Sequence, residues 1–271
     1  TTPTNPGTPD QLMPNGKTDW PNEAAVNNLQ RTVTETIHYI YKDGTPVATD
    51  SLQSVSFERN AAVDAVTGAL LGYLTPEQVA SYQADPTSVT LSATDGWVVK
   101  SGSVDFKAVT SPAAPKAGYT ADLTATQAYT VTPTTGSAVL TVTYNPDAQK
   151  ATVSYVDDDA NGAQVHLDTL NGVTAGISDY DKVRTAVEGG LQRLGYIVGD
   201  TDLPANNVVT FDDDASVDQP FVVHLSHQTI AVTPDQPQSP DGQIPTTSTN
   251  WPAGVDAHDL NRTVTQKIQF V

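Results

Sequence analysis

The feature that most constrains this chain is a segment that occurs twice. Residues 31–40 (RTVTETIHYI) recur 231 positions later as residues 262–271 (RTVTQKIQFV). The match continues upstream without a gap, so that Trp20 and Pro21 correspond to Trp251 and Pro252, and the proline spacing of residues 3–14 recurs in residues 234–245. The chain is therefore one full repeat of a longer array, followed by the start of the next repeat.

The repeated decamer has the pattern of a β-strand. Val33, Ile37 and Tyr39 lie on one face at a period of two, and such residues suit a half-buried pleated surface. Position 35 is polar in both copies, as Glu35 and Gln266, so we expect the buried stripe to begin at Ile37.

Two domains with a common plan follow from the rest of the pattern. Residues 152–156 (TVSYV) match residues 36–40 (TIHYI), and both domains end on an alternating strand. A hairpin, a crossing segment and a returning strand on one sheet predict an α+β fold of two tandem β-grasp (ubiquitin-like) domains, elongated and strand-rich, with Pro-rich linkers at both ends. The predicted segments are an extended Pro-rich spacer (1–30), a first domain with an inserted helix (31–149), a second domain (150–232), a second Pro-rich spacer (233–261) and the first strand of the next repeat (262–271).

Two helices are predicted from their end signals. Thr75, Pro76 and Gln78 form a capping-box pattern at the start of the inserted helix. In the second domain Ser178 or Asp179 is expected to cap a helix that Gly195 ends. Gly189 and Gly190 weaken this helix by about 1 kcal/mol each, so it must depend on packing.

Composition excludes several functions. The chain has 13 basic and 31 acidic residues, a net charge of −18, which argues against nucleic acid and anionic membranes as partners. The absence of cysteine excludes disulfides, thiol nucleophiles and cysteine-bound zinc. No apolar run is long enough to insert into a bilayer, and no signal peptide is present. Because the sequence contains no nucleophile elbow, phosphate-binding glycine loop or HExxH motif, we do not expect an enzyme.

Several motifs, in order, resemble the repeats of mucus-binding proteins of Lactobacillus, which are cell-wall-anchored adhesins. Residues 31–44 (RTVTETIHYIYKDG) resemble the start of the first domain of those repeats. Residues 155–159 (YVDDD) resemble the opening of their mucin-binding domain, and residues 208–219 with 223–227 (VHLSH) resemble its end. Trp20 and Pro21, with the Pro-rich spacer, resemble the junction between repeats.

This resemblance implies an extracellular protein of the bacterial cell surface whose repeats bind mucin glycans weakly and gain strength from many copies. Two alternatives remain open: a module that recognises immunoglobulin, and a spacer of a surface stalk that binds neither. The protein is expected to be a monomer, or a dimer in which residues 262–271 exchange with the equivalent strand of a second molecule. Val264, Ile268 and Phe270 of that strand have no core of their own.

One acidic segment fits a calcium loop. Asp157, Asp159 and Asn161 match the start of such a loop, and Asp168 stands at its twelfth position. Apart from this calcium, no cofactor is expected. The alternative is a solvated hairpin turn with Asn161 and Gly162 at positive φ. His224 and His227 are three apart on a predicted strand and should point to opposite faces, so we do not expect them to share a metal.

Trp97 and Tyr73 are the candidate ligand-binding residues. Exposed aromatic rings are the usual platforms for sugars and for protein partners, and both residues lie in the inserted part of the first domain. The alternative is that both belong to the core. Trp20 and Trp251 are expected to hold the spacers against a domain.

Overall fold

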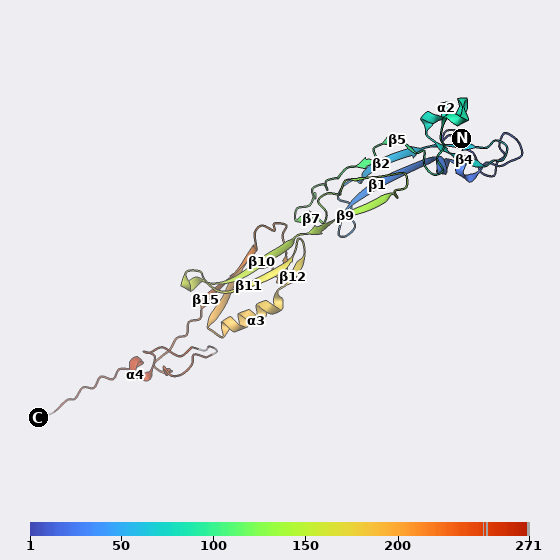
Figure 1. Cartoon of the computed structure of the whole chain (residues 1–271). Helices are drawn as coiled ribbons and strands as arrows, with labels where there is room; N and C mark the ends of the chain where they lie inside the picture. The colour runs from blue at the N-terminus through green and yellow to red at the C-terminus, as the bar shows by residue number, and fades with distance from the viewer. Residues whose placement is uncertain (246, 248, 270–271) are drawn as a thin grey trace. The chain divides into compact units, whose positions relative to one another are not determined.

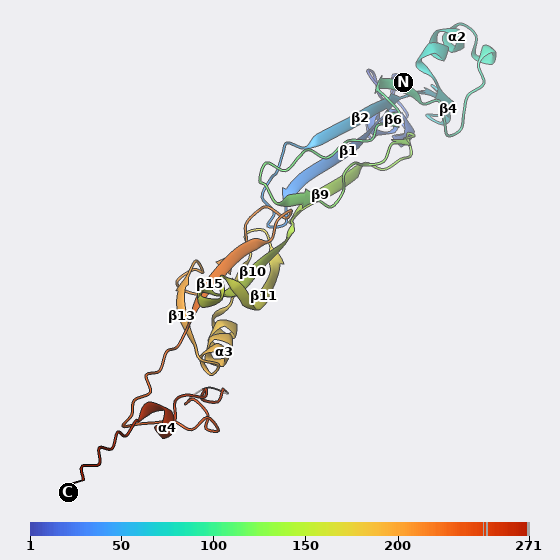
Figure 2. The ribbon, with the colours of Figure 1, turned by 90° about the vertical axis from the view of Figure 1, so that its left-hand side faces the viewer.

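The computed structural model describes residues 1–245, 247 and 249–269. Its chain, drawn in Figure 1 and turned by 90° in Figure 2, forms two compact units. The first unit comprises Thr1–Pro115 with Thr120–Asn145, and the second comprises Lys116–Tyr119 with Pro146–Val271. Both units are rich in strands and poor in helices.

The first unit is built on a five-stranded sheet with the order β5-β2-β1-β9-β7. Two short hairpins, β3 with β4 and β6 with β8, lie outside it. Its strands are β1 (Gln30–Tyr41), β2 (Ser51–Glu58), β3 (Asn60–Val63), β4 (Leu70–Leu74), β5 (Val98–Gly102), β6 (Asp105–Phe106), β7 (Tyr119–Ala121), β8 (Tyr129–Thr130) and β9 (Ala138–Pro146). Its helices are η1 (Asn22–Ala24), α1 (Val26–Leu29), η2 (Pro76–Gln78), α2 (Val79–Ala84) and η3 (Pro86–Ser88).

The second unit is built on a four-stranded sheet with the order β11-β10-β15-β13, and Figure 1 shows α3 on one side of it. A separate hairpin joins β12 and β14. Its strands are β10 (Ala148–Asp157), β11 (Ala163–Val173), β12 (Ile177–Asp179), β13 (Tyr196–Thr201), β14 (Val208–Thr210) and β15 (Gln219–His227). Its helices are η4 (Asp158–Ala160), α3 (Asp181–Gln192) and α4 (Ala257–Leu260).

The two sheets share the plan predicted from the sequence. In each, the first two strands form an antiparallel hairpin, and the first strand also pairs in parallel with the last long strand. Tyr39 of β1 pairs with Val142, and the matching Tyr155 of β10 pairs with Val223. All four residues are buried, so the central parallel pair is the core of each sheet.

The buried stripe of β1 is longer than we expected. Burial alternates from Val33 to Tyr41 and includes Glu35, which is 1% exposed, so the prediction that the stripe begins at Ile37 is wrong. Glu35 is accommodated because Gln53 of β2 donates a hydrogen bond of 2.8 Å to its carboxylate. A polar side chain at a period-two position can therefore belong to the core when its partner is supplied by the neighbouring strand.

The start signal of the inserted helix acts as predicted. Thr75 and Gln78 form the capping box at η2, and the helix continues as α2 until Asp85. In the second unit the N-cap of α3 is Tyr180, without a side-chain cap bond, so the prediction of Ser178 or Asp179 as the cap is wrong. The Asp179 carboxylate instead accepts the amide of Asp181, the first residue of α3, at 3.0 Å. Gly195 follows the helix with a φ of +93°, a conformation that favours glycine.

The Pro-rich spacers are folded, which corrects the prediction of an extended segment. In the first spacer (residues 1–30) the chain reverses at Gly16, and the Met13 amide donates to the Thr18 carbonyl at 2.7 Å. The Trp20 ring then lies against Gly7, whose Cβ position is 2.8 Å from the ring. Trp20 thus closes the spacer on itself. The fold comes from these local contacts, and a proline count does not reveal it.

The second spacer (residues 233–261) repeats this fold. Bonds that match at an offset of 231 include Ile244 to Thr249, Trp251 to Gly242 and Gln238 to Val255, which correspond to Met13 to Thr18, Trp20 to Gln11 and Gly7 to Ala24. Each spacer also ends in a short helix, α1 or α4. In the two spacers the sequence repeat is therefore also a repeat of structure.

Candidate functional site

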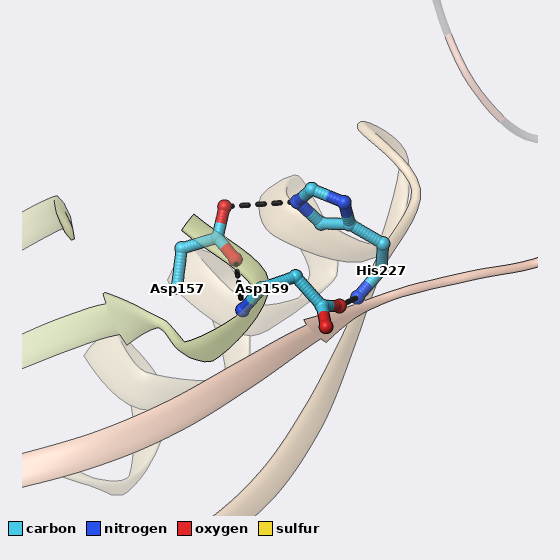
Figure 3. A group of neighbouring side chains, drawn as sticks. All are labelled: Asp157, Asp159 and His227. Atoms are coloured by element: carbon cyan, nitrogen blue, oxygen red, sulfur yellow. Dashed lines mark hydrogen bonds and ion pairs between the residues drawn. The ribbon is translucent and has the colours of Figure 1, made fainter. Parts of the chain in front are cut away.

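One group of side chains with metal-binding and titratable chemistry lies at the end of the second unit, at the junction of β10 with η4. Because β10 and β15 run parallel, their carboxyl ends meet, and residues about 70 positions apart become neighbours. Figure 3 shows Asp157, Asp159 and His227 pointing toward one another. We call these three residues the Asp-His cluster.

Hydrogen bonds fix the geometry of the Asp-His cluster. His227 Nε2 lies 2.9 Å from Asp157 Oδ2. The other Asp157 oxygen accepts the amides of Asp159 and Ala160 at 3.1 and 3.2 Å, so it caps η4. Asp159 accepts the backbone amide of His227 at 2.6 Å. Asp157 is buried, whereas the His227 side chain is 53% exposed.

A second histidine–aspartate pair, His224 with Asp158, lies near the same end of β15. His224 Nδ1 lies 2.8 Å from Asp158 Oδ1. The hydrogen bond to Asp158 raises the pKa of His224, and Asp200 and Asp202 add to this electrostatically. His224 and His227 thus have different carboxylate partners, Asp158 and Asp157.

The Asp-His cluster has coupled pKa shifts. The hydrogen bond from Asp157 raises the pKa of His227, with further support from the charge of Asp159. For Asp157, desolvation opposes ionisation, but the His227 hydrogen bond and charge and the two backbone amides outweigh it, so the pKa is lowered. The ion pair is therefore complete in mildly acidic solution.

We expect the contribution of the Asp-His cluster to the stability of the second unit to be largest between about pH 4 and 6.5. The contribution of His227 is fully present below its ordinary pKa and is lost as pH rises through the raised pKa of the folded state. The contribution of Asp157 is lost as pH falls through its lowered pKa. Denaturant unfolding at pH 5 and pH 8 should show a loss of stability at the higher pH that is smaller in His227→Gln.

The matched control for this prediction is His258→Gln, an exposed histidine of the second spacer. It should keep the full difference between pH 5 and pH 8. An equal difference in both variants would remove the Asp-His cluster from the explanation.

The predicted calcium ligands are only partly brought together. Asp157 and Asp159 are neighbours, but Asp168 pairs with Val153, four positions along β10, which is about 13 Å at the usual rise of a strand. Asp168 instead accepts a hydrogen bond of 2.6 Å from Tyr180 and lies 3.1 Å from His166. Calcium binding by the four residues stays a prediction, with Asp168 outside the cluster in this conformation.

The turn after η4 has the geometry of a hairpin turn, which is the alternative to a calcium loop. Asn161 and Gly162 have φ values of 57° and 74°, which is the conformation expected for a hairpin turn of this type. Among the described residues, the Asp-His cluster presents three ligand atoms within 4.8 Å of one another. The imidazole is a donor typical of transition-metal sites, whereas calcium takes oxygen ligands. Sequence spacing could not identify His227, because only the parallel pairing of β10 and β15 brings it there.

The candidate ligand-binding residues Trp97 and Tyr73 lie in one stacked group of the first unit. The Arg59 guanidinium is 3.3 Å from the centre of the Tyr73 ring and 4.3 Å from that of Trp97. Tyr73 is 6% exposed, and Trp97 is half-buried. Of the two, Trp97 therefore offers the more accessible ring. Arg59 itself was not singled out by the sequence, because only the tertiary structure places it between the rings.

Within the described part of the chain, every helix is too short or too polar to span a lipid bilayer. Residues 24–148 match a family described as Muc B2-like domain, and residues 149–227 match a family described as mucin binding domain. A comparison with curated proteins found no match.

Solved structures are also similar to this chain. Mub-RV is 35% identical over 44% of this chain and 53% of its own, with a TM-score of 0.32. The type 2 repeat of the mucus binding protein MUB from Lactobacillus reuteri is 25% identical over 52% and 56%, with a TM-score of 0.25. The MucBP domain of an adhesion protein from Pediococcus pentosaceus is 29% identical over 43% and 99%, with a TM-score of 0.30. The chain spans about half the length of the first two structures.

Proposed function

Because the chain carries a Muc B2-like domain followed by a mucin binding domain, we propose that it is a repeat unit of a bacterial surface adhesin that binds host mucin. The match of residues 149–227 to the mucin binding domain is the observation that supports this most. Each repeat binds weakly through its surface, and the array gains strength because one bound repeat raises the effective concentration of the next. The protein lies outside the cell, anchored to the cell wall in its parent.

We also infer a β-grasp fold for both domains. In the second unit, a hairpin, the helix α3 and a returning strand parallel to the first give the strand order that such a fold requires. The first unit has the same hairpin and parallel strand, with a Pro-rich crossing in place of the helix. The corresponding boundaries are 31–149 and 150–232, with the spacers at 1–30 and 233–261.

The test compares the 271-residue chain with a tandem of two such chains at equal repeat concentration. We expect the tandem to bind immobilised mucin about 100-fold or more tightly, because the second contact is intramolecular. Deglycosylation of the mucin should abolish binding by both proteins. Equal affinity of the single chain and the tandem would contradict the multivalent mechanism. Undiminished binding to deglycosylated mucin would contradict glycan recognition, in which Trp97 and Tyr73 are the candidate residues.

Immunoglobulin binding is the second candidate function. β11 and β13 are the edge strands of the four-stranded sheet, and Leu167 and Ile197 on them are 46% and 49% exposed. An open edge of this kind can accept a strand from a protein partner. An immunoglobulin pull-down that is insensitive to glycosidase would favour this function. The absence of binding to both mucin and immunoglobulin would favour a stalk spacer.

The segment 262–269 has no regular structure, and Val264 and Ile268 are 94% and 65% exposed. Phe270 lies outside the described residues. We propose that this segment can replace the equivalent β1 segment of a second molecule, which gives a strand-exchanged dimer in place of the monomer.

A further inference from the structure

The first spacer is docked on the β3–β4 hairpin of the domain that follows it. Thr18 Oγ1 donates to the Val66 carbonyl at 3.2 Å, and Asn15 Nδ2 donates to the Ala65 carbonyl at 2.8 Å. Thr1 and Ala61 exchange two backbone hydrogen bonds of 2.7 and 3.0 Å. The spacer is therefore an integral part of the first unit.

Apolar packing supports the same docking. Met13 is 5% exposed and lies within 3.7 Å of the Cβ position of Gly68, in the turn of the hairpin. Leu29, at the end of the spacer, is fully buried against Ala61 and Tyr73. These contacts show which positions of the spacer form its docking face.

In the second spacer the same face is open. Ile244 and Leu260, which correspond to Met13 and Leu29, are both partly exposed. The positions that correspond to Thr1, Met13 and Thr18, namely Val232, Ile244 and Thr249, line a pocket of about 500 Å³ in the second unit. Tyr196, His227 and Trp251 form other parts of its wall.

We propose that this pocket receives the β3–β4 turn, residues 64–68, of a second copy of the unit that follows in the array. The two spacers share the same internal hydrogen bonds, so the docking face is already formed before a partner arrives. The turn also carries Val66, whose side chain is 80% exposed although its carbonyl is held by Thr18.

This docking gives the spacer a second role. It connects the His227 end of one mucin binding domain to the hairpin of the next Muc B2-like domain through packed side chains. A tandem array then has defined junctions instead of free linkers, whatever its ligand.

The test uses a tandem chain in which residues 1–261 are followed by residues 31–271, so that Asn261 precedes a second Arg31. The chain has no cysteine, so two can be introduced: Thr249→Cys, and Gly68→Cys in the second copy. In the first unit a Cβ at Gly68 lies 2.6 Å from Thr18 Cγ2, so T18C with G68C in the single chain is the reference pair. The control partner is Gly44→Cys in the second copy, a glycine that also has positive φ but has open space around it.

We expect the tandem pair to form its disulfide at least about tenfold faster than the Gly44 pair, and at a rate close to the reference pair. A rate equal to that of the Gly44 pair would overturn the proposal, as would disulfides that form only between separate chains. A second measurement avoids the strained position 68. In the cysteine-free tandem, Ile244→Asp should lower the melting temperature of one Muc B2-like domain. In the single chain it should leave the melting temperature of the Muc B2-like domain unchanged. An equal change of this melting temperature in both proteins would overturn the proposal.

Discussion

Arg59→Ala is expected to lower the stability of the first unit by about 3 to 4 kcal/mol, because it removes two ring contacts and two charged hydrogen bonds whose separate contributions are not additive. Arg59 is 6% exposed and lies between the Tyr73 and Trp97 rings. Its Nε and Nη1 atoms donate to the Asn28 and Thr94 carbonyls at 2.9 and 2.7 Å. Burial lowers the pKa of Arg59 from its ordinary value. Removal of the side chain leaves a cavity and two carbonyls without their donor.

The expected result in calorimetry is a fall of roughly 10 °C in the melting temperature of the first unit, with the second unit unchanged. Arg59→Lys should lose about half as much, because lysine keeps the charge but cannot stack as a plane or donate in two directions at once. Arg193→Ala, an exposed arginine after α3, is the charge-matched control and should change little. A similar melting temperature for the Arg59 and Arg193 variants would show that the stacked group does not stabilise the unit.

Gly172→Ala is expected to destabilise the second unit by about 2 to 3 kcal/mol through overpacking. Gly172 lies on β11 directly under the Phe211 ring, and a Cβ there would lie 2.1 Å from Phe211 Cε2. Phe211 is 3% exposed and belongs to the main core of the unit, so the ring has little room to move. Glycine is required at this position because the ring occupies the space of a side chain.

A glycine-to-alanine substitution in α3 should have the opposite effect and stabilise the unit. Gly189 and Gly190 have open space at their Cβ positions, and each replacement by alanine should stabilise the helix by about 1 kcal/mol. Chemical denaturation of the three single variants measures both effects with one chemical change. Destabilisation by Gly189→Ala, or a neutral Gly172→Ala, would show that the packing of these sites differs from that described.

Local signals in the sequence predicted most of the secondary structure. The period-two stripe of β1, the capping box at Thr75 and the glycine after α3 each depend on residues a few positions apart. The repeat of 231 residues corresponds to a repeat of structure in the two spacers, since their hydrogen bonds are made within each copy. The candidate site was predicted only in part: Asp157 and Asp159 were found from their spacing, while His227 was not.

What the sequence by itself determined is therefore the element order, the two-domain plan with its shared hairpins, and the relationship to mucus-binding repeats. Only the tertiary structure decided that Glu35 is buried, that Arg59 separates Tyr73 from Trp97, and that the spacers are folded. The first two depend on contacts between separate segments, whereas a periodic pattern reports only which face of a strand or helix a residue occupies. The spacers fold through local backbone hydrogen bonds, which their Pro-rich composition does not reveal.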